Sequence, residues 1–314
     1  MSETKFCSVL TQNSSEPLAG TAPSADHFVF ISWPKRFWKY EALESGGGFP
    51  QGLKKWLKNQ NIINGKISIR LVSQAGLEHE TVEIFIYPGQ WYYSKIQPGS
   101  IKEVLEAHFQ SEKYNSISAE KLRQEQIFIC THGRHDKCCA KFGQKLADKM
   151  RQQVLKHNLA VEVWDSSHLG GHRFAATMID FPGGSSYGHL TADEIPKFIA
   201  SRKQGDIYGS AYRGSVFLSG LEQVAEALLQ HFCHSRQWSC QFNLRHVEQL
   251  TEDKFKCVAE FNHADNSGRS QNHRTDELIF SFGQKNFESP AGCDAPDELQ
   301  NRKCWVIESH RYNL

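Results

Sequence analysis

The stretch that decides the fold runs from QIFICTHGRHDKCC (126–139) to AVEVWDSSHLGGH (160–172). Each begins with a short apolar or alternating run, typical of a β-strand, and continues into a polar loop. Residues 140–157 between them have the apolar periodicity of one long amphipathic helix. The order strand, helix, strand therefore predicts that the loop after Cys130 faces the loop that carries His168. Thiols and imidazoles would then meet at one point.

The whole chain has an ordinary globular composition. Its 314 residues predict two or three domains. The net charge is +1 and no basic stripe occurs, so nucleic acid is not expected as an obligatory partner. A secretory signal and a long apolar run are both missing from the sequence, which predicts a cytoplasmic protein without a membrane span. In that compartment the nine cysteines should stay reduced unless they bind metal or perform redox chemistry.

The order of predicted elements occurs twice. PGQWYYSKI (88–96) aligns without gaps on PGGSSYGHL (182–190), and the apolar positions of the following helices continue in the same register. Ser32, at the end of the first predicted strand, falls near Cys130. We interpret this as a duplicated α/β unit of thioredoxin-like type, whose second copy alone carries the Cys/His site. A coincidence between two common β-turn-β-α patterns is the alternative.

The chain can be divided accordingly. We predict a degenerate thioredoxin-like domain at 1–115, with an irregular lead-in over 1–26, and a thioredoxin-like domain that carries the site at 120–215. A strand is expected at 174–181 in the second of these. The remainder, 216–314, predicts a small C-terminal α+β module of three or four antiparallel strands. The fold class is therefore α/β with an α+β appendage.

Thiolate and imidazole together form the ligand set of zinc, iron–sulfur and some copper sites. Cys130 and Cys139 are too far apart in sequence for the Cys-x2-4-Cys knuckle of structural zinc sites. His168 and His172 would share one face of a helix, but the two intervening glycines favour a loop with positive φ angles. The spacing alone leaves the metal open.

These motifs resemble the sucrase/ferredoxin-like family of thioredoxin-like [2Fe–2S] proteins. The resemblance rests on CTHG (130–133), DKCC (136–139) and, most specifically, SHLGGHRFA (167–175). Further matches are FCS (6–8), GTAP (20–23), YGH (187–189) and YRG (212–214), so that it covers residues 5 to about 215.

The resemblance implies a [2Fe–2S] cluster held by Cys130, Cys139, His168 and His172. It also implies a ferredoxin-like electron carrier whose partner is an unidentified redox protein, donor or acceptor. No carboxylate pair supports a sucrase activity, so a redox carrier is favoured over a catalyst. One position departs from the family: Cys138 stands where a basic residue is common. Cys138 is the alternative ligand, and the family register favours Cys139.

Other residues near the site are candidates for supporting roles. The possible contributors of hydrogen bonds or positive charge to the cluster are His132, Arg134, His135, Lys137, Arg173 and His189. Two neutral imidazoles in place of two thiolates raise a cluster's potential, as in Rieske centres. If the histidine-bound iron lies near solvent, reduction should couple to imidazole protonation, and the potential should depend on pH.

Two other function classes remain open. One is a thiol oxidoreductase that uses Cys138 or Cys139, although no Cys-x-x-Cys pair is present. The other is a binding module in which zinc only folds the loops. Outside the motif, Cys7, Cys257, Cys293 and Cys304 are expected to be buried small residues or unreactive thiols.

Overall fold

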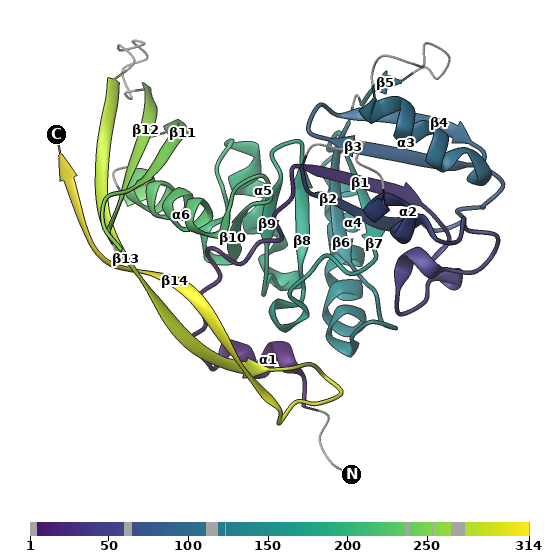
Figure 1. The fold of residues 1–314 in the computed structure, drawn as a ribbon, viewed down its shortest axis with the longest axis horizontal. Coiled ribbons are helices and arrows are strands. Elements are labelled where there is room, and N and C mark those ends of the chain that lie inside the picture. The colour runs from purple at the N-terminus through teal and green to yellow at the C-terminus, as the bar shows by residue number, and fades with distance from the viewer. Residues whose placement is uncertain are drawn as a thin grey trace.

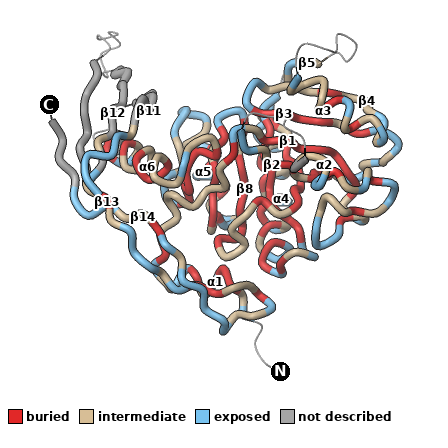
Figure 2. The backbone as a smooth tube through the Cα atoms, in the orientation of Figure 1, coloured by how far each residue is buried: buried red, intermediate tan, exposed pale blue. Residues whose placement is uncertain are grey.

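The structure is a computed structural model that describes residues 5–59, 65–110, 119–122, 124–235, 239–252, 254–264 and 274–313. Within those ranges ten strands form one mixed sheet, and four more form a separate antiparallel sheet at the C-terminus (Figure 1). Buried residues concentrate along the large sheet and on the helix faces turned toward it (Figure 2). The fold is thus mixed α/β with a small C-terminal sheet, as predicted.

The helices are α1 Cys7–Gln12, α2 Leu53–Asn59, α3 Ile101–Phe109, α4 Gln144–Lys156, α5 Ile195–Lys203 and α6 Gly220–Ser235. The strands of the large sheet are β1 His27–Ser32, β2 Ile67–Ser73, β3 Val82–Tyr87, β4 Trp91–Ile96, β5 Glu120–Lys121, β6 Glu125–Cys130, β7 Val161–Ser166, β8 Met178–Phe181, β9 Ser185–Tyr187 and β10 Tyr212–Ser215. The C-terminal sheet contains β11 Ser239–Gln249, β12 Lys254–Ala264, β13 Arg274–Pro290 and β14 Leu299–Asn313.

The large sheet consists of two halves with the same topology. In the first half β1 is parallel to β2 and antiparallel to β3, and β4 follows β3 antiparallel. The second half repeats this pattern with β6, β7, β8 and β9. Each half is therefore a four-stranded unit with the same strand order and the same strand directions. The halves join where β2 pairs antiparallel with β7, Val72 lying opposite Ser166.

Equivalent residues of the two halves contact each other. Phe30 and Phe128 each lie two residues before the end of the first strand of their half, and their rings stack with centroids 3.7 Å apart. Tyr87 and Phe181 each end the third strand, and their rings stack at 4.0 Å. A residue meets its own equivalent only near a two-fold axis. The halves are therefore related by a pseudo-two-fold, with an aromatic core between them.

Backbone conformation follows the same register. Lys95 and His189, 94 positions apart, have φ angles of 54° and 55°. Ile101 and Ile195, also 94 positions apart, both begin a helix and are fully buried. Positive φ is uncommon outside glycine, so its occurrence at equivalent positions of the two halves supports the predicted duplication. The exact division into domains stays a prediction.

Each half buries its helices on the face away from the shared core. In the second half α4 and α5 cover β6, β7 and β8 through Leu146, Met150 and Phe198. In the first half α2 and α3 cover β1, β2 and β3 through Leu53 and Leu105. The buried face of each helix is its apolar face. Short helices are stabilised mainly by burying such a face, which is why apolar periodicity predicts where they occur.

Two local predictions were wrong. The lead-in over 1–26 contains α1, whose neighbour Phe6 packs edge-on against Phe142 with centroids 5.4 Å apart. Tertiary packing therefore supports a helix too short to be stable alone. The strand expected from residue 174 begins at Met178, because Phe174 belongs to a 3₁₀ turn, His172–Phe174.

The C-terminal module has four antiparallel strands, as predicted. The β13–β14 hairpin extends back along the molecule, and its tip lies beside α1 (Figure 1). The hairpin near the C-terminus thus meets the N-terminal helix α1, which itself packs beside Phe142 in the middle of the chain. Among the described helices, none is both long and apolar enough to cross a bilayer.

Candidate metal centre

The centre lies at one edge of the large sheet, where two parallel strands end. Cys130 is the last residue of β6 and pairs in register with Ser166, the last residue of β7. His168 follows two residues later. Because parallel strands end at the same edge of a sheet, the two loops face each other. The loop-to-loop arrangement predicted from the sequence is confirmed.

Cys139 reaches this edge from a π-helix, Cys139–Gly143, that leads into α4. A Cβ atom at Gly143 would lie 1.9 Å from the carbonyl oxygen of Cys130, so only glycine permits this approach. Wide π turns are frequent at functional sites. The helix predicted over 140–157 is present, but its apolar pattern does not indicate that the first turn is wide.

Cys130, Cys139 and His168 form one compact group of two buried thiols and a half-buried imidazole, with their ligand atoms within 4.8 Å of one another. His168 Nδ1 lies 3.9 Å from Cys130 Sγ and 3.8 Å from Cys139 Sγ. Hydrogen bonding from Cys139, together with His168, holds the pKa of Cys130 well below its usual value. The hydrogen bond to Cys130 and burial raise the pKa of Cys139. This donor set suits a soft metal.

His172 lies next to this group and not within it. Its ring centroid is 5.8 Å from that of His168. Its Nδ1 lies 3.3 Å from Asp136 Oδ2 and 3.4 Å from Cys7 Sγ. Burial lowers the pKa of His172, which favours the neutral form of the ring. The structure therefore brings three of the four expected ligands together and holds the fourth beside them.

The loop between the two histidines depends on its glycines and on Arg213. Gly170 and Gly171 have φ angles of 95° and 74°, as expected for a loop. Arg213, fully buried, donates from Nη1 to the carbonyl oxygen of Gly170 at 3.2 Å. It also donates from Nε and Nη2 to the hydroxyl and carbonyl oxygens of Thr21. The matches GTAP (20–23), SHLGGHRFA (167–175) and YRG (212–214) thus meet at one guanidinium group.

Aromatic rings support His168 from one side. The ring of His135 stacks on that of His168 with centroids 3.8 Å apart, and Tyr40 stacks on the other face of His135 at 4.8 Å. Burial, and next the charge interaction with His168, lowers the pKa of His135 to about 4. His132 is buried, and its Nδ1 accepts a hydrogen bond of 3.3 Å from the backbone N–H of His168. His132 thereby positions the backbone of an expected ligand.

The remaining predicted supporting residues are engaged elsewhere. Arg134 donates to the carbonyl oxygen of Trp38. Arg173 forms a buried bidentate ion pair with Glu16, with Nη2 and Oε1 2.7 Å apart. Lys137 pairs with Asp294 at 2.8 Å on the surface. The ring of His189 packs edge-on against Phe174 at 5.4 Å.

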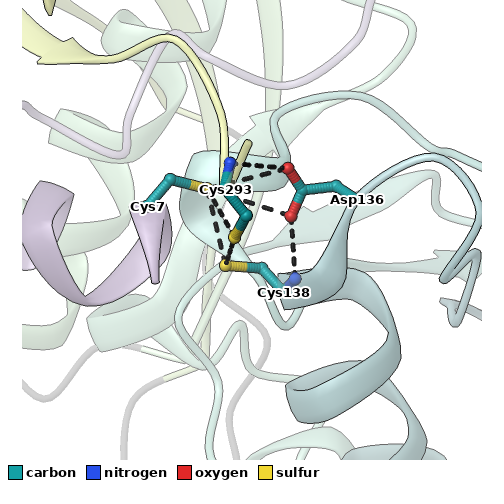
Figure 3. Close-up of side chains that lie close together, drawn as sticks. All are labelled: Cys7, Asp136, Cys138 and Cys293. Carbon is teal, nitrogen blue, oxygen red and sulfur yellow. Dashed lines mark hydrogen bonds between the residues drawn. The ribbon is translucent and has the colours of Figure 1, made fainter. Parts of the chain in front are cut away.

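Cys138 belongs to a second group, and Figure 3 shows its members pointing toward one another. Cys7, Asp136, Cys138 and Cys293 are all buried, and their ligand atoms lie within 4.8 Å of one another. Burial of Cys7 and Cys293 was predicted, but their convergence was not. They stand 286 residues apart, and neither lies in a recognisable metal motif. In the sequence, only its place in the DKCC motif distinguishes Asp136.

Comparison with known proteins separates the large sheet from the C-terminal module. The sucrase/ferredoxin-like family model matches residues 18–214, well over half of the chain. The chain belongs to the sucrase/ferredoxin-like family. The matched segment contains both halves of the large sheet, the Cys130–His172 stretch and Arg213. The C-terminal module of this family member lies outside the match.

Individual relatives are distant. "Altered inheritance of mitochondria protein 32" of Debaryomyces hansenii is 27% identical over 103 residues, which make up 31% of this chain. The chain spans 38% of the length of that relative. A thioredoxin-like [2Fe–2S] ferredoxin from Aquifex aeolicus covers 29% of the chain and 91% of its own length, at 11% identity and a TM-score of 0.27. A second structure of the wild-type Aquifex aeolicus protein gives 10% identity, a TM-score of 0.26 and coverage of 29% and 97%. At these TM-scores the likeness fixes no equivalence between residues.

Proposed function

We propose that this protein is a ferredoxin-like electron carrier whose [2Fe–2S] cluster is held by Cys130, Cys139, His168 and His172. The observation that carries the proposal is the compact group of two buried thiols and one half-buried imidazole at the ends of β6 and β7. A bound cluster would supply reversible one-electron transfer. The partners we propose are redox proteins of the cytoplasm that donate or accept this electron.

The donor chemistry fits a cluster. Thiolates and imidazoles are the ligands of mixed-ligand [2Fe–2S] centres. His172 lies beside the other three residues, and its Nδ1 is within reach of the Asp136 carboxylate. A carboxylate partner on one ring nitrogen fixes the tautomer and leaves the other nitrogen, Nε2, to bind metal. Asp136 would therefore orient His172 toward iron.

Burial differs between the two kinds of ligand. Cys130 and Cys139 are completely buried, whereas His168 and His172 are partly exposed. The imidazoles would then face solvent and the thiolates the protein core. An electron would enter from the imidazole side, where a proton can follow it. The reduction potential should accordingly fall as pH rises.

The test is anaerobic purification of the full chain, followed by iron and acid-labile sulfide analysis and visible absorption. We expect equal iron and sulfide, a red-brown colour and sulfide-to-iron charge-transfer bands. Titration of the potential from about pH 6 to about pH 10 should give a slope approaching about 59 mV per pH unit for one proton per electron. A colourless protein without iron would refute the cluster, and a flat potential would refute the proton coupling.

A zinc-stabilised binding module is the second candidate. One observation favours it: His168 Nδ1 lies 3.8–3.9 Å from both thiols, as in a compact site for a single ion. Tetrahedral zinc with bonds of about 2.0–2.3 Å brings sulfur and nitrogen ligands to similar separations. Zinc at Cys130 and Cys139 in place of iron and sulfide, in protein prepared without oxygen, would favour this candidate.

A thiol oxidoreductase is less well supported. Cys138 and Cys139 are both fully buried, whereas a reactive thiolate needs access to its substrate. Reductase activity of metal-free protein that disappears on Cys139→Ser would favour it over the electron carrier.

A further inference from the structure

We propose that Cys7, Cys138, Cys293 and Asp136 form a second metal site, which takes a tetrahedral thiophilic cation such as Zn²⁺. The site adjoins the proposed cluster, since Asp136 and Cys7 both contact His172, but it shares no ligand with the cluster. It would tie the N-terminal helix and the C-terminal hairpin to the π-helix that begins at Cys139.

The three sulfurs form a compact triangle (Figure 3). The Sγ–Sγ distances are 3.4 Å for Cys7–Cys138, 3.0 Å for Cys138–Cys293 and 3.6 Å for Cys7–Cys293. Zinc–sulfur bonds of about 2.3 Å at tetrahedral angles separate the sulfurs by about 3.8 Å. Outward movements of less than about 1 Å would therefore open the triangle to this geometry.

Asp136 supplies an oxygen at the same place. Its Oδ1 accepts the backbone N–H of Cys138 at 2.7 Å, and its Oδ2 accepts that of Cys293 at 3.1 Å. Both carboxylate oxygens lie 3.9–4.0 Å from Cys7 Sγ. The two amides, together with His172 Nδ1 at 3.3 Å from Oδ2, fix the carboxylate and leave Oδ1 a further lone pair for the metal. Three sulfurs and one oxygen complete a four-coordinate set.

Hydrogen bonds to sulfur indicate where negative charge would reside. Ser8 donates to Cys138 Sγ from its hydroxyl at 3.2 Å and from its backbone N–H at 3.5 Å. These are the donors that a metal-bound thiolate accepts from its surroundings. The soft sulfurs select zinc over magnesium or calcium, which prefer all-oxygen sites.

A disulfide is the main competing use of these thiols. It would join Cys138 and Cys293, whose sulfurs are 3.0 Å apart, and leave the buried thiol of Cys7 without a role. A metal uses all four groups. It also explains why side chains from α1, from residues 136–138 and from the tip of the β13–β14 hairpin converge. The ligands come from segments up to 286 residues apart. Metal binding would thus stabilise the association of the C-terminal module with the ferredoxin-like part.

The experiment measures zinc, iron and sulfide in the full chain purified without oxygen, for wild type, Cys7→Ser, Cys293→Ser and Cys304→Ser. Cys304 is the matched control, since it is also a buried free thiol but lies in β14 outside both groups. We expect wild type and Cys304→Ser to hold one equivalent of zinc, and Cys7→Ser and Cys293→Ser to lose it. Iron and sulfide should remain in all four, which separates this site from the cluster.

A second measurement uses wild type alone and does not depend on how the variants fold. Zinc is replaced by Co²⁺ in cluster-containing protein, and tetrahedral cobalt–thiolate absorption is expected. Zinc content unchanged in both Cys7→Ser and Cys293→Ser, or wild type without cobalt–thiolate bands, would overturn the proposal. A Cys138–Cys293 disulfide found by mass spectrometry in the anaerobic wild type would do so as well.

Discussion

Arg213 donates a hydrogen bond from Nη1 to the carbonyl oxygen of Gly170, inside the loop that carries both expected histidine ligands. Burial lowers the pKa of Arg213 to about 9, so the guanidinium group remains charged at pH 7. Its other donors go to Thr21, near the N-terminus. A buried cation without a paired carboxylate is costly, and it is retained here because its rigid fork holds three backbone segments in place.

Arg213→Lys should loosen that loop. Lysine keeps the charge but cannot reproduce the planar fork, so we expect a loss of about 2–4 kcal/mol in the free energy of unfolding, measured by urea denaturation. Iron retention during purification should also fall. Arg202→Lys is the control, because Arg202 pairs with Asp180 and Glu125 away from the centre. Equal iron loss in both variants would contradict a specific role for Arg213.

Gly171→Ala should lower the free energy of unfolding by more than the strain of its positive φ angle alone would cause. Gly171 has φ of +74°, and a Cβ atom there would lie 2.6 Å from Arg213 Nη2. Gly205 has a similar φ of +77° but open space around it. Chemical denaturation should show a cost of about 1 kcal/mol for Gly205→Ala and about 3 kcal/mol for Gly171→Ala. Equal costs would mean that the loop adapts to the methyl group.

His168→Ala should abolish cluster binding, whereas His135→Ala should leave it intact. Both rings lie at the centre and stack on each other. Only His168 belongs to the compact group with Cys130 and Cys139. Iron and sulfide analysis of the two variants separates a ligand from a supporting ring. Loss of iron in His135→Ala with retention in His168→Ala would exchange the two roles.

His172→Cys should keep a cluster and lower its potential. A thiolate adds negative charge where a neutral imidazole stood, so the potential should move toward the value of about −400 mV typical of four-cysteine clusters. The measurement is a redox titration followed by absorption, with His157→Cys on the surface as the control. A potential equal to that of wild type would show that His172 does not bind iron.

His189→Asn should reduce the acid sensitivity of the fold. Burial lowers the pKa of His189 to about 4, below the value of about 6.5 expected in the unfolded chain. The unfolded state therefore binds more protons between these values, and stability falls as pH decreases from about 6.5 toward about 4. Asparagine tolerates the φ of 55° at this position.

The measurement for this variant is urea denaturation at pH 7 and at pH 5. The loss of stability between them should be about 1–2 kcal/mol smaller in His189→Asn than in wild type. His157→Asn, at an exposed position, is the control. A loss as large as that of wild type would show that His189 titrates alike in both states.

Much of the fold was predictable because local patterns report burial. Alternating and continuous apolar runs gave the strands on both sides of Cys130, and a gapless register of 94 positions gave the repeat of turn, strand and helix. The short helix α1 could not be predicted, since its stability comes from packing against distant residues such as Phe142.

By itself, the sequence determined the family, the two α/β units and the edge of the sheet where Cys130 and His168 meet, because strand periodicity and chain order decide which loops face each other. It did not determine which of two adjacent cysteines lies there. Neighbouring residues on a helical turn point about 100° apart, and only the packing of the π-helix decides that Cys139 lies beside Cys130. Tertiary structure alone directs Cys138 to Cys7 and Cys293, since no local pattern connects residues at opposite ends of the chain.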